Sequence, residues 1–277
     1  MGKKSRRKGQ GKQRMPFVAR TFEGLPSEGD WIALREFVPS ADAVVTLQDG
    51  SSVRVCSLLP GGGAGIVRPD GEIWLGLQVP HNFGDVSRDL AHVVEVARTL
   101  EPGTPVTIGD PGVGARLQDL VAADSTFDVT VHEGFDYWIL GEERSDAMQA
   151  ALDQANETAA PTVRLAQVDA AYWTEMGSHR YLRWVQPHPE EKLLDALARL
   201  QAVQADRLGD DTRLIGSFRA HGLLVPVWET ELDAEALEPE AVAFADRLAE
   251  ALADDSELTA DQRRARQSIL HRQLTIR

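Results

Sequence analysis

The chain has 277 residues, of which 43% are hydrophobic and 26% charged, and its formal net charge is −14. This composition is typical of a globular protein with one large or two ordinary domains. No apolar run approaches the roughly 20 residues of a membrane span, and no hydrophobic segment follows the basic N-terminus as in a signal peptide. The single cysteine, Cys56, excludes an internal disulfide. We therefore expect a cytoplasmic protein that does not bind a membrane.

The charge is unevenly distributed along the chain. The first 14 residues contain no acid and seven basic residues, namely Lys3, Lys4, Arg6, Arg7, Lys8, Lys12 and Arg14. Removing these seven charges from −14 leaves about −21 on the remainder, which should repel nucleic acid. We expect residues 1–16 to form a disordered basic tail, because they lack apolar anchors. Two interpretations remain open: an arm that contacts RNA or the ribosome through counterion release, or a tail that solubilises the chain or folds back on its acidic body.

Residues 17–143 are predicted to form a first α+β module. An Asp49-Gly50 turn between two apolar alternating segments indicates a β-hairpin. Apolar residues at helical spacing predict a long helix over 85–100. The expected order is a helix at 30–38, strands at 43–47, 53–59 and 73–79, the helix at 85–100, a long loop at 101–125, and a hairpin of strands 127–131 and 135–140.

Residues 144–255 are predicted to form a second module, and residues 256–277 a C-terminal helix and tail. Pro189 suits the first turn of a helix, where the missing N–H costs nothing. Thr259 and Gln262 form the sequence signature of a capping box. The expected order is a helix at 145–156, strands at 161–165, 170–175 and 180–185, a helix from 189, a hairpin of strands 214–218 and 223–228, and a helix at 240–252.

The two halves share an internal pattern. Residues 74–81, WLGLQVPH, and residues 181–188, YLRWVQPH, both read aromatic-Leu-x4-Pro-His, and a helix is predicted after each. We therefore predict an α+β fold of two related modules in the order α-β-β-β-α-β-β-α. Their sheets should be mostly antiparallel, with helices packed on one face.

Two resemblances extend this prediction. The element order resembles that of type III secretion chaperones, small α+β modules that pair and bind other polypeptides. The stretches RTFEGLPSEGDWIALRE, LRWVQPHPEEKLLDALARL and GSFRAHGLLVPVW resemble an uncharacterised family of bacterial proteins. Members of that family often carry an N-terminal zinc motif of the SEC-C type, like the tail of the preprotein translocase motor. The first 20 residues here contain no Cys or His, so that zinc site is absent from this sequence.

Candidate functional residues cluster around the repeated pattern. His81 and His188 each follow a proline at a predicted strand end, where they either share a binding or acid–base position or serve as turn and cap residues. Aromatic residues in strands either form a binding surface or fill the space between sheet and helices. The candidate binding set is His81, His188, Arg183, Trp74, Tyr181 and Trp184. No metal site, cofactor motif or catalytic constellation is recognisable.

These observations favour a non-enzymatic protein-binding or chaperone-like factor whose partner is another polypeptide. An RNA- or ribosome-associated protein that acts through residues 1–14 is the first alternative. The second is an enzyme whose site is assembled from dispersed residues such as His81, His188 and Arg183.

Overall fold

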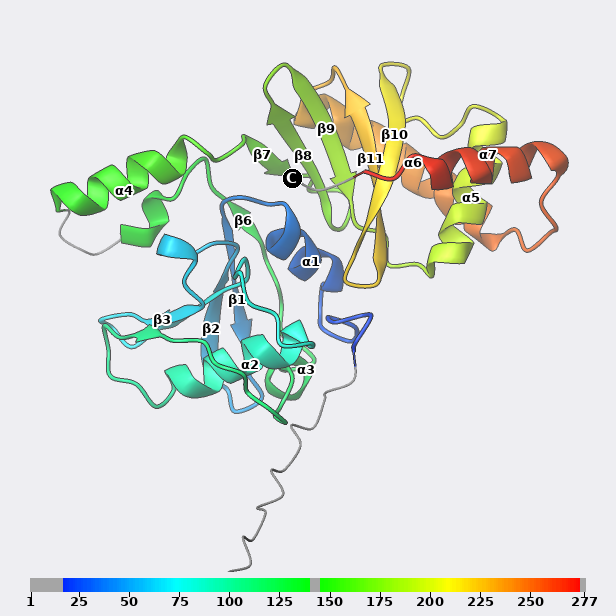
Figure 1. Ribbon diagram of the computed structural model, residues 1–277. Coiled ribbons are helices and arrows are strands. Elements are labelled where there is room, and N and C mark those ends of the chain that lie inside the picture. Colours follow the sequence, from blue (N-terminus) through cyan, green and yellow to red (C-terminus); the bar gives the residue numbers. More distant parts are fainter. Residues whose placement is uncertain (1–16, 140–144, 275–277) are drawn as a thin grey trace, which may run out of the picture.

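The computed structural model in Figure 1 describes residues 17–139 and 145–274 and contains two sheets. The first sheet has the strand order β5-β3-β4-β2-β1-β6. Its strands are β1 (Ala41–Thr46), β2 (Ser52–Cys56), β3 (Gly65–Val67), β4 (Ile73–Gly76), β5 (Pro105–Val106) and β6 (Thr130–Val131). The predicted hairpin is present, with β1 and β2 antiparallel around Gly50, whose φ of 83° suits glycine. The β2–β4 pair is parallel.

Different elements cover the two faces of the first sheet. Helices α2 (Val86–Ala97) and α3 (Leu117–Leu120) pack on one face, where Leu90 and Val94 of α2 share a core with Val45 and Val55. The other face is partly covered by the 3₁₀ turn η2 (Asp136–Ile139) and helix α4 (Asp146–Asn156), through a cluster that includes Trp74. A second 3₁₀ turn, η1 (Pro60–Gly62), joins β2 to β3.

The hairpin predicted over 127–131 and 135–140 is wrong. Only Thr130 and Val131 pair in a strand, and their partner is β1. Residues 136–139 form the 3₁₀ turn η2, because Tyr137, Trp138 and Ile139 all pack into one cluster instead of alternating between two faces.

The second sheet is entirely antiparallel and has the order β10-β11-β9-β8-β7. Its strands are β7 (Thr162–Arg164), β8 (Ala171–Met176), β9 (His179–Trp184), β10 (Thr212–Ala220) and β11 (Leu223–Thr230). Helices α5 (Glu190–Ala202), α6 (Ala234–Ala253) and α7 (Ala260–His271) gather on one side of it (Figure 1). Helix α6 begins six residues before the predicted start, because the Asp233 side chain caps it by accepting from the Ala236 N–H at 2.9 Å.

Side-chain alternation divides the second sheet between two cores. Trp173, Leu182 and Trp184 face helices α5 and α6, whereas Tyr172 and Val225 belong to the core on the opposite face. That opposite face is covered by helix α1 (Glu28–Glu36), so helices pack on both faces of the second sheet. The sequence pattern could not reveal this, because α1 precedes the first sheet in the chain.

Helix α1 joins the two halves of the molecule. Trp31 stacks on Phe127 of the first half, with ring centroids 4.5 Å apart. Asp30 points to the second half: its carboxylate accepts from the Arg164 guanidinium at 2.9 and 3.1 Å and from the Tyr172 hydroxyl at 2.6 Å. Gly29 lies so close to the second sheet that an added Cβ would come within 2.6 Å of the Ala170 Cβ. The helix is thus a shared element of both halves.

The predicted element order holds in the second half, where α4, β7, β8, β9, α5, β10, β11 and α6 follow one another. The first half departs from it through the extra strands β3 and β5 and the missing hairpin. The strand pairing also differs, since β2 and β4 are parallel and the corresponding β8 and β9 are antiparallel. The internal duplication predicted from the repeated pattern is therefore not reflected in the pairing of the strands.

No helix within 17–139 and 145–274 combines the length and the apolar character that crossing a membrane requires.

Candidate functional site

A groove of about 500 Å³ lies where β9 ends and α6 passes over the second sheet. Strand β9 ends at Trp184, and the Gln186 N–H then donates to the Leu224 carbonyl at 3.1 Å. Pro187 and Pro189 follow and end the strand pairing, because proline has no N–H to donate. The groove is open on one side and mostly apolar, with its walls formed by Gln167, Val168, Asp169, Trp184, Gln186, Pro187, His188, Ala245, Leu248, Ala249 and Leu252.

The indole of Trp184 is held firmly at the base of the groove. Its Nε1–H donates to the Asp169 carbonyl at 2.9 Å. Its ring lies 6.2 Å from that of Trp228 and 6.0 Å from that of Phe244. Since the hydrogen bond and both ring contacts restrain the same indole, Trp184 provides a rigid apolar surface.

Helix α6 supplies the facing wall through Ala245, Leu248, Ala249 and Leu252. Their i, i+3, i+4 and i+7 spacing places all four on one stripe of the helix. Leu248 is buried and Ala249 exposed, so the groove opens to solvent along the Ala249 side of the stripe. The two alanines leave space that larger residues would fill.

Gln186 is a buried polar residue of the groove whose side-chain donor is unpaired among the described residues. Its side chain is 3% exposed on a residue basis, and its Nε2 has no hydrogen-bond partner among the described residues. A buried donor without an acceptor costs about 1–3 kcal/mol. Gln186 therefore leaves one buried, unpaired donor in the wall of the groove.

His188 lies at the mouth of the same groove. Partial burial lowers the pKa of its imidazole below the ordinary value of 6.5. The ring is therefore neutral at neutral pH, and it adds no positive charge to the groove.

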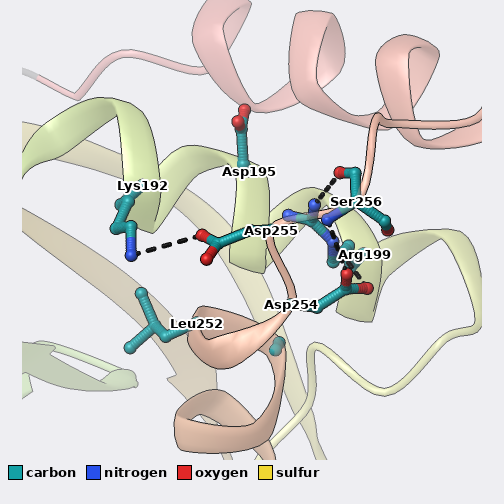
Figure 2. A pocket seen from close by; sticks show the side chains of 8 residues that line it. Lys192, Asp195, Arg199, Leu252, Asp254, Asp255 and Ser256 are labelled. Atoms are coloured by element: carbon teal, nitrogen blue, oxygen red, sulfur yellow. Dashed lines mark hydrogen bonds and ion pairs between the residues drawn. The ribbon is translucent and has the colours of Figure 1, made fainter.

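A smaller polar hollow of about 120 Å³ adjoins the groove and shares Leu252 with it. Figure 2 shows Lys192 directed at Asp255, 3.4 Å away, and Arg199 directed at Asp254 and Ser256. Arg199 Nε lies 3.1 Å from Asp254, and Arg199 Nη2 donates to the Ser256 carbonyl at 2.6 Å. These pairs tie α5 to the connection between α6 and α7, so the hollow is a helix-packing feature.

The structure brings two of the predicted binding residues, Trp184 and His188, into one groove and separates the other four from it. Tyr181 and Arg183 lie on the opposite face of the sheet, where the Arg183 guanidinium sits 5.6 Å from the Phe37 ring centroid. His81 is exposed between β4 and α2, and Trp74 is buried against the first sheet. No contact among the described residues joins His81, Arg183 and His188. The basic residues Lys3 to Arg14 lie outside the described residues.

A separate polar cluster surrounds Trp74 on the first sheet. The Arg54 guanidinium bridges Asp42 and Glu72, and Asp42 also contacts His132 Nε2. Trp74 Nε1 donates to Glu72 at 2.7 Å, so the cluster satisfies its own polar groups. Burial raises the pKa of the nearby Cys56 thiol, which therefore remains protonated and unreactive. The arrangement stabilises the sheet face.

Sequence reasoning missed Gln186 and the α6 stripe. Gln186 lies between Trp184 and His188 in the sequence. This position between two candidate residues was the sequence feature that could have identified it as part of the site. The α6 stripe begins about 60 residues later, and only the packing of α6 on the sheet places it opposite Trp184.

The described parts of the chain contain no group of three or more His, Cys, Asp or Glu residues arranged to hold a metal ion. Fold and groove together define a mixed α+β protein with two mostly antiparallel sheets and one largely apolar groove at a strand end. Over residues 21–277 the sequence matches the model of a family of unknown function, DUF5926, and the chain belongs to that family. This agrees with the uncharacterised family expected from the sequence. No curated protein and no solved structure matches the chain.

Proposed function

We propose that this protein is a non-enzymatic polypeptide-binding factor that holds an apolar segment of a partner in the groove between β9 and α6. The observation that carries the proposal is the Nε2 of Gln186, unpaired among the described residues, in a groove whose lining is mostly apolar. A polypeptide supplies both things that such a groove needs, an apolar side chain to bury and a backbone carbonyl to accept the hydrogen bond.

Three further points support a polypeptide ligand. The groove is large enough for one or two apolar side chains, and Trp184 is a rigid aromatic surface of the kind that dominates binding energy at interfaces. His188 is neutral near pH 7, so the groove does not attract an anion such as phosphate through that ring. The element order of the second half resembles that of type III secretion chaperones, which bind polypeptides.

We propose that the protein acts in the cytoplasm, on the basis of its single cysteine. The alternative of RNA or ribosome binding rests on the basic residues 1–14 alone. A chain that lacks these residues separates the two functions.

The test uses fluorescence anisotropy with a labelled peptide of Gly and Ser that carries a central Leu-Val-Leu. The variant Ala249→Gln projects a longer side chain into the groove, and Ala253→Gln is its control, because Ala253 is also exposed on α6 but does not line the groove. We expect the wild-type chain and A253Q to bind equally and A249Q to bind at least about tenfold more weakly.

Equal binding by A249Q and A253Q, or no binding of the apolar peptide to the wild-type chain, contradicts the proposal. A single-stranded RNA oligonucleotide is measured alongside. RNA binding that disappears with residues 1–14, in the absence of peptide binding, supports the alternative instead.

A further inference from the structure

Strand β10 is an edge strand, and part of its free side is covered by the segment that follows α7. Its other side pairs with β11. The Ser217 N–H donates to the Arg272 carbonyl at 3.2 Å, and the Leu274 N–H donates to the Ser217 carbonyl at 2.9 Å. These two bonds form a parallel bridge where the chain leaves α7 and reaches β10 (Figure 1). The chain therefore places a segment of its own, residues 272–274, against the edge of the second sheet.

The sequence of β10 suits this edge to a closely approaching backbone. Ser217 lies opposite Pro226 of β11, and proline has no N–H to donate. The N–H and the carbonyl of Ser217 therefore point away from β11, toward the edge. Gly216 lies so near the segment that an added Cβ would collide with the Arg272 carbonyl oxygen. Glycine at this position leaves room that a side chain would fill.

Two side chains set the register of the bound segment. The Arg272 Nη1 donates to the Leu214 carbonyl at 3.0 Å. Leu274 is half-buried and packs against the core that α1 shares with the second sheet. Gln273, between them, is exposed. The edge of β10 thus contacts an Arg and a Leu two residues apart, and the residue between them points to solvent.

The segment is held more lightly than the helix before it. Two backbone hydrogen bonds and one half-buried leucine hold residues 273–274. Helix α7 is fixed by the buried Ile269 and by Arg266, whose Nε donates to Asp195 of α5 at 2.6 Å. The segment can therefore leave β10 while α7 stays in place. Exchange of the segment between two copies would require α7 to leave α5, because the segment begins at the residue that ends α7.

We propose that the edge of β10 is a docking site for an extended segment of a separate polypeptide, and that residues 272–274 occupy it in cis. The partner's segment runs parallel to β10 and exchanges two backbone hydrogen bonds with Ser217. It presents an Arg and a Leu at the positions of Arg272 and Leu274. Strand addition of this kind takes its affinity from backbone hydrogen bonds and its specificity from alternate side chains. The site is separate from the groove between β9 and α6, and neither depends on the other.

The test measures the fluorescence anisotropy of a labelled peptide, HRQLTIR, which copies residues 271–277. Leu274→Pro removes the N–H that donates to Ser217 together with the leucine side chain, so it frees the edge of β10. Gln273→Ala is the matched control, because Gln273 is exposed and makes neither of the two bonds. We expect L274P to bind the peptide at least about tenfold more tightly than the wild-type chain or Q273A, in which the attached segment competes at a high effective concentration.

Two altered peptides test the pattern of side chains. HAQLTIR lacks the arginine and HRQSTIR lacks the leucine, and each should bind to L274P at least about fivefold more weakly than HRQLTIR. Adding Gly216→Ala to L274P should abolish binding, because the new Cβ collides with the backbone of the peptide. Circular dichroism shows whether each variant has kept its fold.

A second measurement needs no variant. An excess of unlabelled peptide added to the isotope-labelled wild-type chain should move the Leu274 amide resonance to the position of an unstructured residue. An unmoved resonance, or no binding of HRQLTIR to folded L274P, overturns the proposal.

The remaining outcomes are equally decisive. Equal binding of the peptide by L274P and the wild-type chain shows that the segment does not compete for the site and overturns the proposal. Equal binding of the three peptides by L274P overturns the Arg and Leu pattern. If light scattering shows a dimer of the wild-type chain that the peptide dissociates, a second copy occupies the edge and the inference of a separate partner is overturned.

Discussion

Replacing Gln186 by methionine should stabilise the protein while it weakens peptide binding. The Gln186 Nε2 donor is buried without an acceptor in the part of the chain that the structure describes, and such a group costs about 1–3 kcal/mol. Methionine has a similar length and no donor, and the backbone bond from the Gln186 N–H to Leu224 does not depend on the side chain. We expect a gain of about 1 kcal/mol, which raises Tm by about 2–4 °C for a chain of this size.

Gln78→Met is the matched control. The Nε2 of Gln78 donates to the Leu34 carbonyl at 2.8 Å and to the Val38 carbonyl at 2.7 Å, so it is fully satisfied. The same substitution there removes two hydrogen bonds and leaves two acceptors at the end of α1 without this donor. We expect a loss of about 2 kcal/mol.

The measurement is the Tm of both variants by differential scanning calorimetry at pH 7.5, followed by anisotropy with the apolar peptide. If Q186M loses stability as Q78M does, Gln186 Nε2 has an acceptor in solution and the reasoning is refuted. If Q186M gains stability and binds the peptide as the wild-type chain does, Gln186 does not contact the ligand.

Two other predictions concern the junction and the groove. Asp30→Ala leaves the Arg164 guanidinium and the Tyr172 hydroxyl without their shared acceptor, so thermal unfolding should show a loss of about 3 kcal/mol in the free energy of unfolding. Tyr172→Phe should lose about 1 kcal/mol, because it removes one hydrogen bond. Equal small losses in the two variants would mean that water replaces the carboxylate. His188 should titrate below pH 6.5 by NMR, because burial lowers its pKa in the folded chain. The unfolded chain then binds more protons, so the contribution of His188 to stability is lost as the pH falls from about 6.5 through the folded pKa, and His188→Gln should remove this dependence.

The sequence predicted those elements whose signal is local. The Asp49-Gly50 turn fixed the β1–β2 hairpin, and the helical spacing of Leu90, Val93 and Val94 fixed α2, because both patterns depend only on neighbouring residues. The expected mixed α+β class with mostly antiparallel sheets is confirmed. Residues 135–139 were misread as a strand, because their aromatic side chains gather around Trp74 and only the folded chain brings these segments together.

The candidate site was predictable in part for the same reason. Trp184 and His188 are close in sequence and share the groove. Tyr181 and Arg183 are equally close in sequence but lie on the opposite face, since side chains in a strand alternate and β9 has a core on each side. The α6 wall depends on a long-range packing contact that no local pattern records.

The position of α1 has a consequence for biosynthesis. Phe37, just beyond the helix, packs against Tyr172 and Phe218, which are synthesised much later. At about 5–20 residues per second, the ribosome needs roughly 10–40 s to produce the rest of this partner surface. During that interval the apolar side of α1 has only the first sheet to cover it. The N-terminal half should therefore leave the ribosome with an apolar face of α1 exposed to solvent. Completion of the β10–β11 hairpin should be the step that buries this face.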